Sequence, residues 1–205
     1  MSKPEFQIEV KKYIVWMSIL VISVSCNPHS EHLYYELEKK ELASGVRYDS
    51  LFKGLYLGMP HEDFRDYCLE MHKAREFREG GLKSGSWVEW KLPDELSYPA
   101  FINFYPEFKN DVISEMRAGI YYDNTLVFTK ENPFHQDSLL HDVLHLMDQW
   151  YGPGFIKVES PDKKGKDVYV KINGNRRITV FKGSSNYIID LWFVDLLARK
   201  EDDDQ

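Results

Sequence analysis

The order in which helix-like and strand-like segments follow one another is the sequence feature that most constrains this fold. Apolar residues recur at helical spacing in two segments, one after Pro60 and one after Pro133. The predicted strands are 51–57, 86–92, 99–105 and 112–122 around the first helix, and 125–129, 168–172, 176–181 and 187–194 around the second. Runs of strands that follow one another directly predict an antiparallel sheet. We therefore expect an α+β fold with the helices packed on one face of the sheet.

The same order of strand, helix and three strands occurs twice, with a spacing of about 75 residues. This repetition predicts two α+β halves, at 45–124 and 125–200, followed by an acidic tail at 201–205. The clearest hairpin signal, Asn173-Gly174, lies in the second half. Few residues are identical between the halves, so chance agreement in the order of the elements is the alternative.

The first 25 residues differ in composition from the rest of the chain. Lys11 and Lys12 precede an uncharged, mostly apolar run of 13 residues from Tyr13 to Ser25. An α-helix of that length spans about 20 Å, which is shorter than the ~30 Å hydrocarbon core of a bilayer. The run is therefore typical of the apolar region of a signal peptide. The alternative is a buried helix or strand with an incidental cysteine behind it.

Small residues lead from this run into a cysteine, in the order Ser23-Val24-Ser25-Cys26. The segment 10–26 resembles the lipobox of bacterial lipoproteins. The resemblance implies that the Cys26 thiol receives a diacylglyceryl group, that residues 1–25 are removed, and that the new amino group carries a fatty acid such as palmitate. It also implies a lipid-anchored protein of the bacterial cell envelope. Asn27, in place of Asp after the cysteine, implies the outer membrane.

Two further expectations concern the start of the chain. Glu5 and Glu9 are unusual before a signal peptide, so we predict that the natural start is Val10, read from an alternative initiation codon. Residues 26–44 are predicted to be a lipid-anchored tether and helix. Their partial apolar stripe favours a solvated helix between the membrane and the folded domain.

A second, local resemblance lies at the start of the first predicted helix. Leu57-Gly58-Met59, followed by a helix with Glu62 and Asp63 in its first turn, is similar to the opening of the SmpA/OmlA (BamE) family of small outer-membrane lipoproteins. The resemblance covers residues 57–64, and the family's role in assembly is not carried over to this chain.

Charge and composition exclude several classes of protein. The net charge is -7 and the chain has no long cluster of Lys and Arg, so nucleic acid is not an expected partner. Two cysteines cannot build a disulfide scaffold, and we expect Cys68 to be a buried thiol on a helix. The sequence contains neither a Walker loop nor a G-x-G-x-x-G motif, and we expect no cofactor.

One sequence pattern suggests metal chemistry. His141 and His145 are four residues apart, so they lie on one face of the second predicted helix, where two imidazoles can share a metal ion. A metal-dependent hydrolase built on this pair is the least favoured of our three hypotheses, because no third ligand can be identified. The alternative, which we prefer, is a polar flank beside the apolar stripe of the helix, with no metal and no catalytic residue.

Aromatic residues make up 15% of the chain, and many fall in predicted strands. Some predicted strands are apolar at both odd and even positions, so both of their faces carry apolar side chains. The second face is then either covered by another element or exposed as a binding surface. Trp87, Trp90, Tyr121 and Trp192 are the candidate binding residues. We expect a non-enzymatic domain that binds a protein or an envelope polymer such as a glycan. The alternative is a small-molecule, glycan or lipid-binding module that uses the aromatic sheet face.

Overall fold

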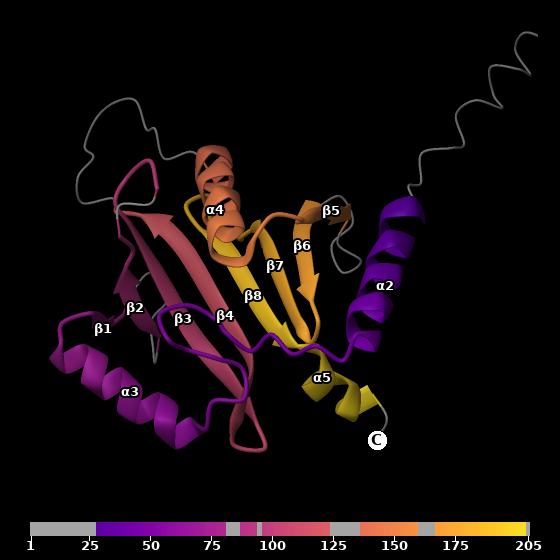
Figure 1. Cartoon of the computed structure of the whole chain (residues 1–205). Coiled ribbons are helices and arrows are strands. Elements are labelled where there is room, and N and C mark those ends of the chain that lie inside the picture. Colours follow the sequence, from indigo (N-terminus) through magenta and orange to yellow (C-terminus); the bar gives the residue numbers. More distant parts are fainter. Residues whose placement is uncertain (1–27, 81–86, 94–95, 124–135, 160–166, 204–205) are drawn as a thin grey trace, which may run out of the picture.

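The computed structural model describes residues 28–80, 87–93, 96–123, 136–159 and 167–203 (Figure 1). These residues form four helices, α2 (Pro28–Ala43), α3 (His61–Lys73), α4 (Gln136–Tyr151) and α5 (Leu196–Asp203). The eight strands are β1 (Phe77–Glu79), β2 (Val88–Lys91), β3 (Ala100–Lys109), β4 (Val112–Tyr122), β5 (Ile156–Glu159), β6 (Asp167–Asn173), β7 (Arg176–Lys182) and β8 (Ile189–Asp195). They form one sheet, and every pairing is antiparallel. The predicted α+β class is confirmed.

The sheet consists of two four-stranded meanders that meet at their last strands. Its strand order is β1-β2-β3-β4-β8-β7-β6-β5, so the second meander runs in reverse order to the first. β4 pairs with β8 from Glu115–Val194 to Ile120–Ile189. Because α3 precedes the first meander and α4 precedes the second, the described elements repeat as one helix followed by four strands. The two short strands β1 and β5, which the sequence did not predict, form the edges of the sheet.

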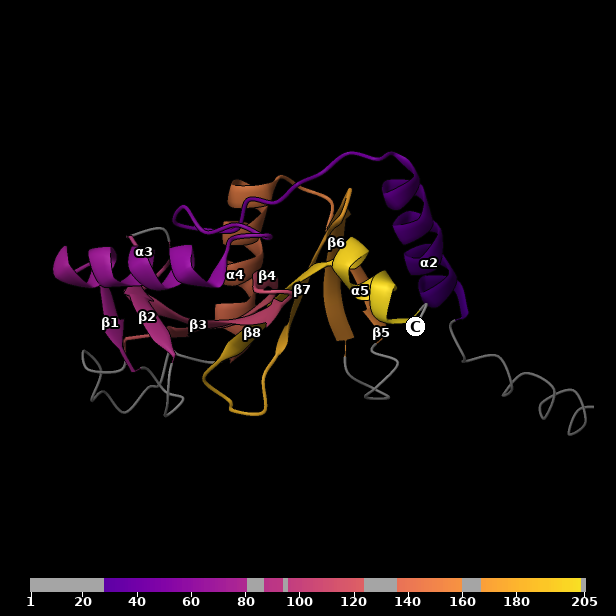
Figure 2. The ribbon, with the colours of Figure 1, turned by 90° about the horizontal axis from the view of Figure 1, so that it is seen from below.

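Two helices and a connecting segment cover one face of the sheet, which we call the front face (Figure 2). α4 contributes four buried apolar residues at helical spacing, Leu139, Val143, Leu146 and Met147. They pack in one core with alternate residues of the central strands, such as Ile102, Ile120 and Ile189. α3 adds Phe64 to the same core. The opposite face of the sheet is called the back face below.

The segment that connects α2 to α3, residues 44–60, crosses the front face and is called the strap (Figure 2). The prediction of a strand at 51–57 is wrong, because the strap forms turns there and only an isolated bridge between Ser50 and Tyr56. The apolar residues of this segment do not alternate as in a strand, because they lie in a turn whose side chains fill the core. Leu51, Phe52 and Leu55 are each at most 5% exposed. The predicted strand at 125–129 lies outside the described residues.

α2 packs against the back face, whereas the sequence predicted a helix exposed to solvent. Tyr34, Leu37 and Leu42 lie against a second apolar cluster that includes Val170 and Val194. These two valines belong to strands of the second meander, so α2 covers that side of the back face (Figure 1). The helix is mostly polar. This narrow apolar contact holds it to the domain together with two hydrogen bonds, from Arg177 to the Tyr34 hydroxyl at 2.9 Å and from the Gly174 N–H to Glu41 at 3.0 Å.

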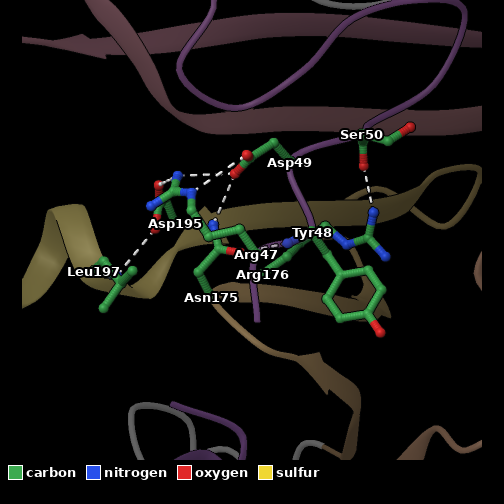
Figure 3. A network of polar contacts seen from close by, with 8 residues as sticks. All are labelled: Arg47, Tyr48, Asp49, Ser50, Asn175, Arg176, Asp195 and Leu197. Carbon is green, nitrogen blue, oxygen red and sulfur yellow. Dashed lines mark hydrogen bonds and ion pairs between the residues drawn. The ribbon is translucent and has the colours of Figure 1, made fainter. Parts of the chain in front are cut away.

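A network of polar contacts fixes the strap to the second meander (Figure 3). Arg47 forms ion pairs with Asp49 at 2.8 Å and with the buried Asp195 of β8 at 3.0 Å. Asn175, in the turn between β6 and β7, donates to Asp49 at 3.0 Å. The backbone N–H of Tyr48 donates to the Asn175 side-chain oxygen at 2.7 Å. The strap is therefore held at one end of the β7–β8 pair, where Asn175 and Asp195 lie close together.

Gly174 lets the strap pass directly over this turn, which yields a stability prediction. Its φ is +52°, and a Cβ atom there would lie 2.0 Å from the Val46 carbonyl oxygen. Gly174→Ala should lower the free energy of unfolding by about 3 kcal/mol or more, since backbone strain and a backbone clash add together. Equilibrium unfolding in urea measures the change.

Gly45→Ala is the matched control for this substitution. Gly45 has a φ of +66°, but nothing lies within 4 Å of a Cβ atom built there. Only the strain of the left-handed backbone remains, about 1–2 kcal/mol. Equal losses in the two variants would show that the contact with Val46 is unimportant.

Candidate functional site

The structure separates the four aromatic residues that the sequence singled out. Trp87, Tyr121 and Trp192 lie on the back face, because the register of the central strands places them on the same side of the sheet as Asn103 and Gly119. Trp90 lies on the front face, because it is three residues after Trp87 in an extended chain. It is 8% exposed and stacks on Trp150, with the ring centroids 6.3 Å apart. Trp90 is therefore part of the core and is excluded from the site.

Four side chains form a row across the back face of β2, β3, β4 and β8, and we call them the aromatic row. Its members are Trp87, Tyr105, Arg117 and Trp192. Tyr105 is opposite Arg117 and Arg117 is opposite Trp192 in the strand register. The ring centroids of Trp87 and Tyr105 are 6.3 Å apart. With strands about 4.8 Å apart, the row is about 14 Å long. Tyr105 and Arg117 were missed because only the register shows that they are neighbours.

Charged side chains hold the β8 end of the aromatic row. The guanidinium carbons of Arg117 and Arg177 lie 4.2 Å and 5.2 Å from the centroid of the Trp192 ring. The Trp192 indole N–H donates to Glu115 at 2.8 Å. Arg117 also donates to Glu107 at 3.0 Å. The indole is thus fixed by two cation–π contacts and a hydrogen bond, which leaves less of its ring surface free for a ligand.

A buried carboxylate stands in the next row of the back face. Glu89 is 2% exposed and accepts hydrogen bonds from the Tyr121 hydroxyl and from Arg78. The Arg78 guanidinium lies 4.4 Å from the centroid of Phe101, and Phe101 packs on Tyr121. This arrangement satisfies the buried charge, as a buried carboxylate requires. Tyr121 therefore supports the face through its hydroxyl and is 7% exposed.

An asparagine and a glycine continue this row toward β8. Asn103 is fully buried, and within the part of the chain that the structure describes both polar atoms of its amide lack a hydrogen-bond partner. A Cβ atom on Gly119 would lie 2.8 Å from the Asn103 side-chain oxygen and 3.5 Å from Asp190 Oδ1. The glycine therefore makes room for the amide between its neighbours. A buried amide without a partner in the protein is a polar group that a water molecule or a ligand can satisfy.

The accessible part of the back face is the middle of the aromatic row. Tyr105 is 39% exposed, and the side chains of Arg117 and Glu107 are 45% and 52% exposed. The described helices α3 and α4 pack on the front face, and α2 packs over the second meander. The face of β3 and β4 thus presents an aromatic ring among charges of both signs.

The histidine pair lies on an exposed side of α4. His141 and His145 are both exposed, and His145 contacts Gln149 at 3.2 Å. Asp142, between them, accepts hydrogen bonds from the Tyr122 hydroxyl and the Ser97 N–H, each at 2.8 Å. Among the described residues, no three His, Cys, Asp or Glu side chains gather where a metal ion could bind. The hydrolase hypothesis therefore gains no third ligand.

Of the two cysteines, only Cys68 lies within the described residues. Cys26 lies outside the described residues, and none of the described helices is long and apolar enough to cross a membrane. Cys68 is half-buried on α3 beside the front-face core. Burial raises the pKa of its thiol to about 11, so it is mostly protonated at neutral pH and unreactive.

Comparison with protein-family models, with curated proteins and with solved structures finds no match to this chain. The geometry of the back face and the features of the sequence are therefore the basis for any functional proposal.

Substitution of the buried carboxylate of Glu89 tests how much its hydrogen bonds stabilise the fold. Glu89→Ala would leave the Tyr121 hydroxyl buried without its acceptor, so we expect the free energy of unfolding to fall by about 2–3 kcal/mol. Glu89→Gln keeps an acceptor of the same size and should lose about half as much. Urea unfolding measures both variants.

Glu107→Ala is the matched control on the same face. This carboxylate pairs with Arg117 in solvent, and exposed ion pairs of this kind contribute at most about 1 kcal/mol. If Glu89→Ala were no more destabilising than Glu107→Ala, the hydrogen bonds to Glu89 would not be what holds the face together.

Proposed function

We propose that this chain is a lipid-anchored lipoprotein of the bacterial cell envelope whose folded domain binds another protein and catalyses no reaction. The single observation that carries the binding function is the aromatic row. Trp, Tyr and Arg are the residue types most enriched at the energetic centres of protein interfaces. Here they stand side by side on a rigid sheet, with Tyr105 and Arg117 more than a third exposed.

The chemistry of the row favours a protein partner over a glycan. Both ion-pair partners, Arg117 and Glu107, are accessible, so the face offers charges of both signs around one aromatic ring. Such a mixed surface suits a protein interface with a polar rim. The Trp192 ring already carries two guanidinium groups, which leaves less of its surface for stacking on a sugar.

A glycan is the second candidate. The observation that favours it is the neighbouring pair of rings, Trp87 and Tyr105, which lie 40° apart in plane. Two such rings can offer apolar surface to the C–H groups of a sugar.

The anchor and the domain lie close together in this proposal. α2 begins at Pro28, two residues after Cys26, and contacts the back face from Tyr34 onward. Tyr34 is eight residues after Cys26, which corresponds to about 12 Å at the rise of an α-helix. A lipid on Cys26 would therefore hold the domain against the membrane surface. The partner protein would have to bind the domain there.

Fatty-acid labelling tests the anchor. Cells that make the wild-type chain and are fed a radioactive or clickable palmitate should yield a labelled protein, since the proposed lipid is attached through Cys26. Cys26→Ala should abolish the label, whereas Cys68→Ala should retain it. Equal labelling of the wild type and Cys26→Ala would overturn the anchor without affecting the binding face.

Site-specific cross-linking in intact cells tests the binding face. A photoreactive amino acid at Tyr105 should form one discrete adduct with a protein, and the same group at His141 on α4 should form none. Arg117→Glu should reduce the Tyr105 adduct roughly tenfold or more, because reversing a charge at the centre of an interface costs well over 1.4 kcal/mol. An adduct that glycosidases remove and proteases leave intact would favour the glycan, and no adduct at all would overturn both candidates.

A further inference from the structure

Two buried cations lie on the front face, on the opposite side of the sheet from the aromatic row. Lys171 of β6 is 7% exposed and Arg176 of β7 is 5% exposed. Lys171 is opposite Ile178 in the strand register, so Arg176 is its diagonal neighbour on the same face. Diagonal neighbours have Cα atoms about 7–8 Å apart, within reach of two long side chains. The two positive charges are therefore close to each other.

Among the described residues, no acid lies in direct contact with either cation. Lys171 donates to the Pro153 carbonyl oxygen, and Arg176 donates through Nη1 to the Ser50 carbonyl oxygen (Figure 3). Within the described part of the chain, neither forms an ion pair within 4.0 Å. Buried charges in proteins are normally paired, so two unpaired cations side by side are an exception.

The surroundings make the protonated cations unfavourable. Burial has the largest effect on the pKa of Lys171 and lowers it, the charge of Asp148 raises it, and the charge of Arg176 lowers it again. Burial also lowers the pKa of Arg176. The charge of Glu41 also raises the pKa of Lys171, and the charge of Asp49 raises the pKa of Arg176. Burial thus disfavours the charged form of both side chains, and a bound anion would oppose this effect.

Further donors next to Arg176 are unused. Its Nε is buried and has no hydrogen-bond partner among the described residues, and the same holds for the hydroxyl of Tyr151, whose ring lies 4.7 Å from the guanidinium carbon. Tyr48 of the strap lies 5.8 Å away and is 45% exposed, so the group stands close to the molecular surface. Gly154 also lies here, and a Cβ atom on it would be 3.5 Å from the Lys171 nitrogen.

We propose that Lys171, Arg176 and Tyr151 form a binding site for the phosphate group of a small anionic ligand. A lysine and an arginine together match the charge of a phosphate, which is between -1 and -2 at neutral pH. The free Nε side of the guanidinium and the Tyr151 hydroxyl supply hydrogen bonds to its oxygens. Because Arg176 also holds Ser50, a ligand here would fasten the strap to the second meander. The site is separate from the aromatic row, and its test does not depend on the proposed protein partner.

The test uses the full-length protein in detergent and inorganic phosphate as the probe. At constant ionic strength, about 10 mM phosphate should raise the melting temperature of the wild type by about 3 °C or more relative to chloride. Equilibrium dialysis with radioactive phosphate should show saturable binding to one site. Lys171→Met and Tyr151→Phe should each weaken that binding, the first roughly tenfold or more.

The variants are chosen so that a folding defect cannot imitate loss of binding. Lys171→Met removes an unfavourable buried charge, and Tyr151→Phe keeps the buried ring, so both should melt at or above the wild-type temperature without phosphate. Lys182→Met, which removes an exposed lysine of β7 paired with Asp137, is the matched control and should bind as the wild type does. Acetate at the same concentration should have little effect.

Three results would overturn the proposal. Phosphate that stabilises the wild type no more than chloride does would exclude the site. Unchanged phosphate binding by Lys171→Met would place the anion elsewhere. Acetate that stabilises more than phosphate would assign the site to a carboxylate ligand.

Discussion

The antiparallel pairing of β4 with β8 is the interaction on which the rest of the structure depends. It joins two four-stranded meanders, each preceded by a helix, into one eight-stranded sheet. The six residue pairs of this contact lie in the middle of the sheet and bring Met116, Ala118 and Ile120 opposite Phe193, Leu191 and Ile189. All six side chains are at most 2% exposed and belong to one front-face core. Without this pairing, neither the front-face core nor the aromatic row would be continuous.

The two faces of the sheet serve different purposes because side chains alternate along each strand. The front face is filled by α3, α4 and the strap, and its polar residues at the second meander are fixed under that strap. The back face carries α2 over the second meander and presents the aromatic row from the first meander to β8. The pairing of β4 with β8 places one arginine and one tryptophan, Arg117 and Trp192, at the junction of the two halves.

Much of the fold follows from periodicity in the sequence, and the exceptions have physical causes. The helices at α3 and α4 and the strands β3, β4, β6, β7 and β8 agree closely with the predicted runs, because their apolar residues have a regular spacing. The segment 51–57 is apolar for a different reason, since a turn of the strap fills the core. β1 and β5 were not predicted because strands of three or four residues at a sheet edge carry too little periodicity. α2 was expected in solvent because its stripe is narrow, and only the apolar cluster beneath it shows that it packs.

The sequence by itself determined the α+β class, the helices α3 and α4, most of the longer strands and the abundance of aromatic residues in strands, since these depend on local spacing. It also supplied the prediction of a lipid anchor at Cys26. The tertiary structure decided which aromatics share a face, because Trp87 and Trp90 differ only in parity and Tyr105 meets Arg117 only through strand register. It likewise brought Lys171, Arg176 and Tyr151 together from three elements. Contacts between distant segments depend on how strands pair, and no local pattern of residues encodes that pairing.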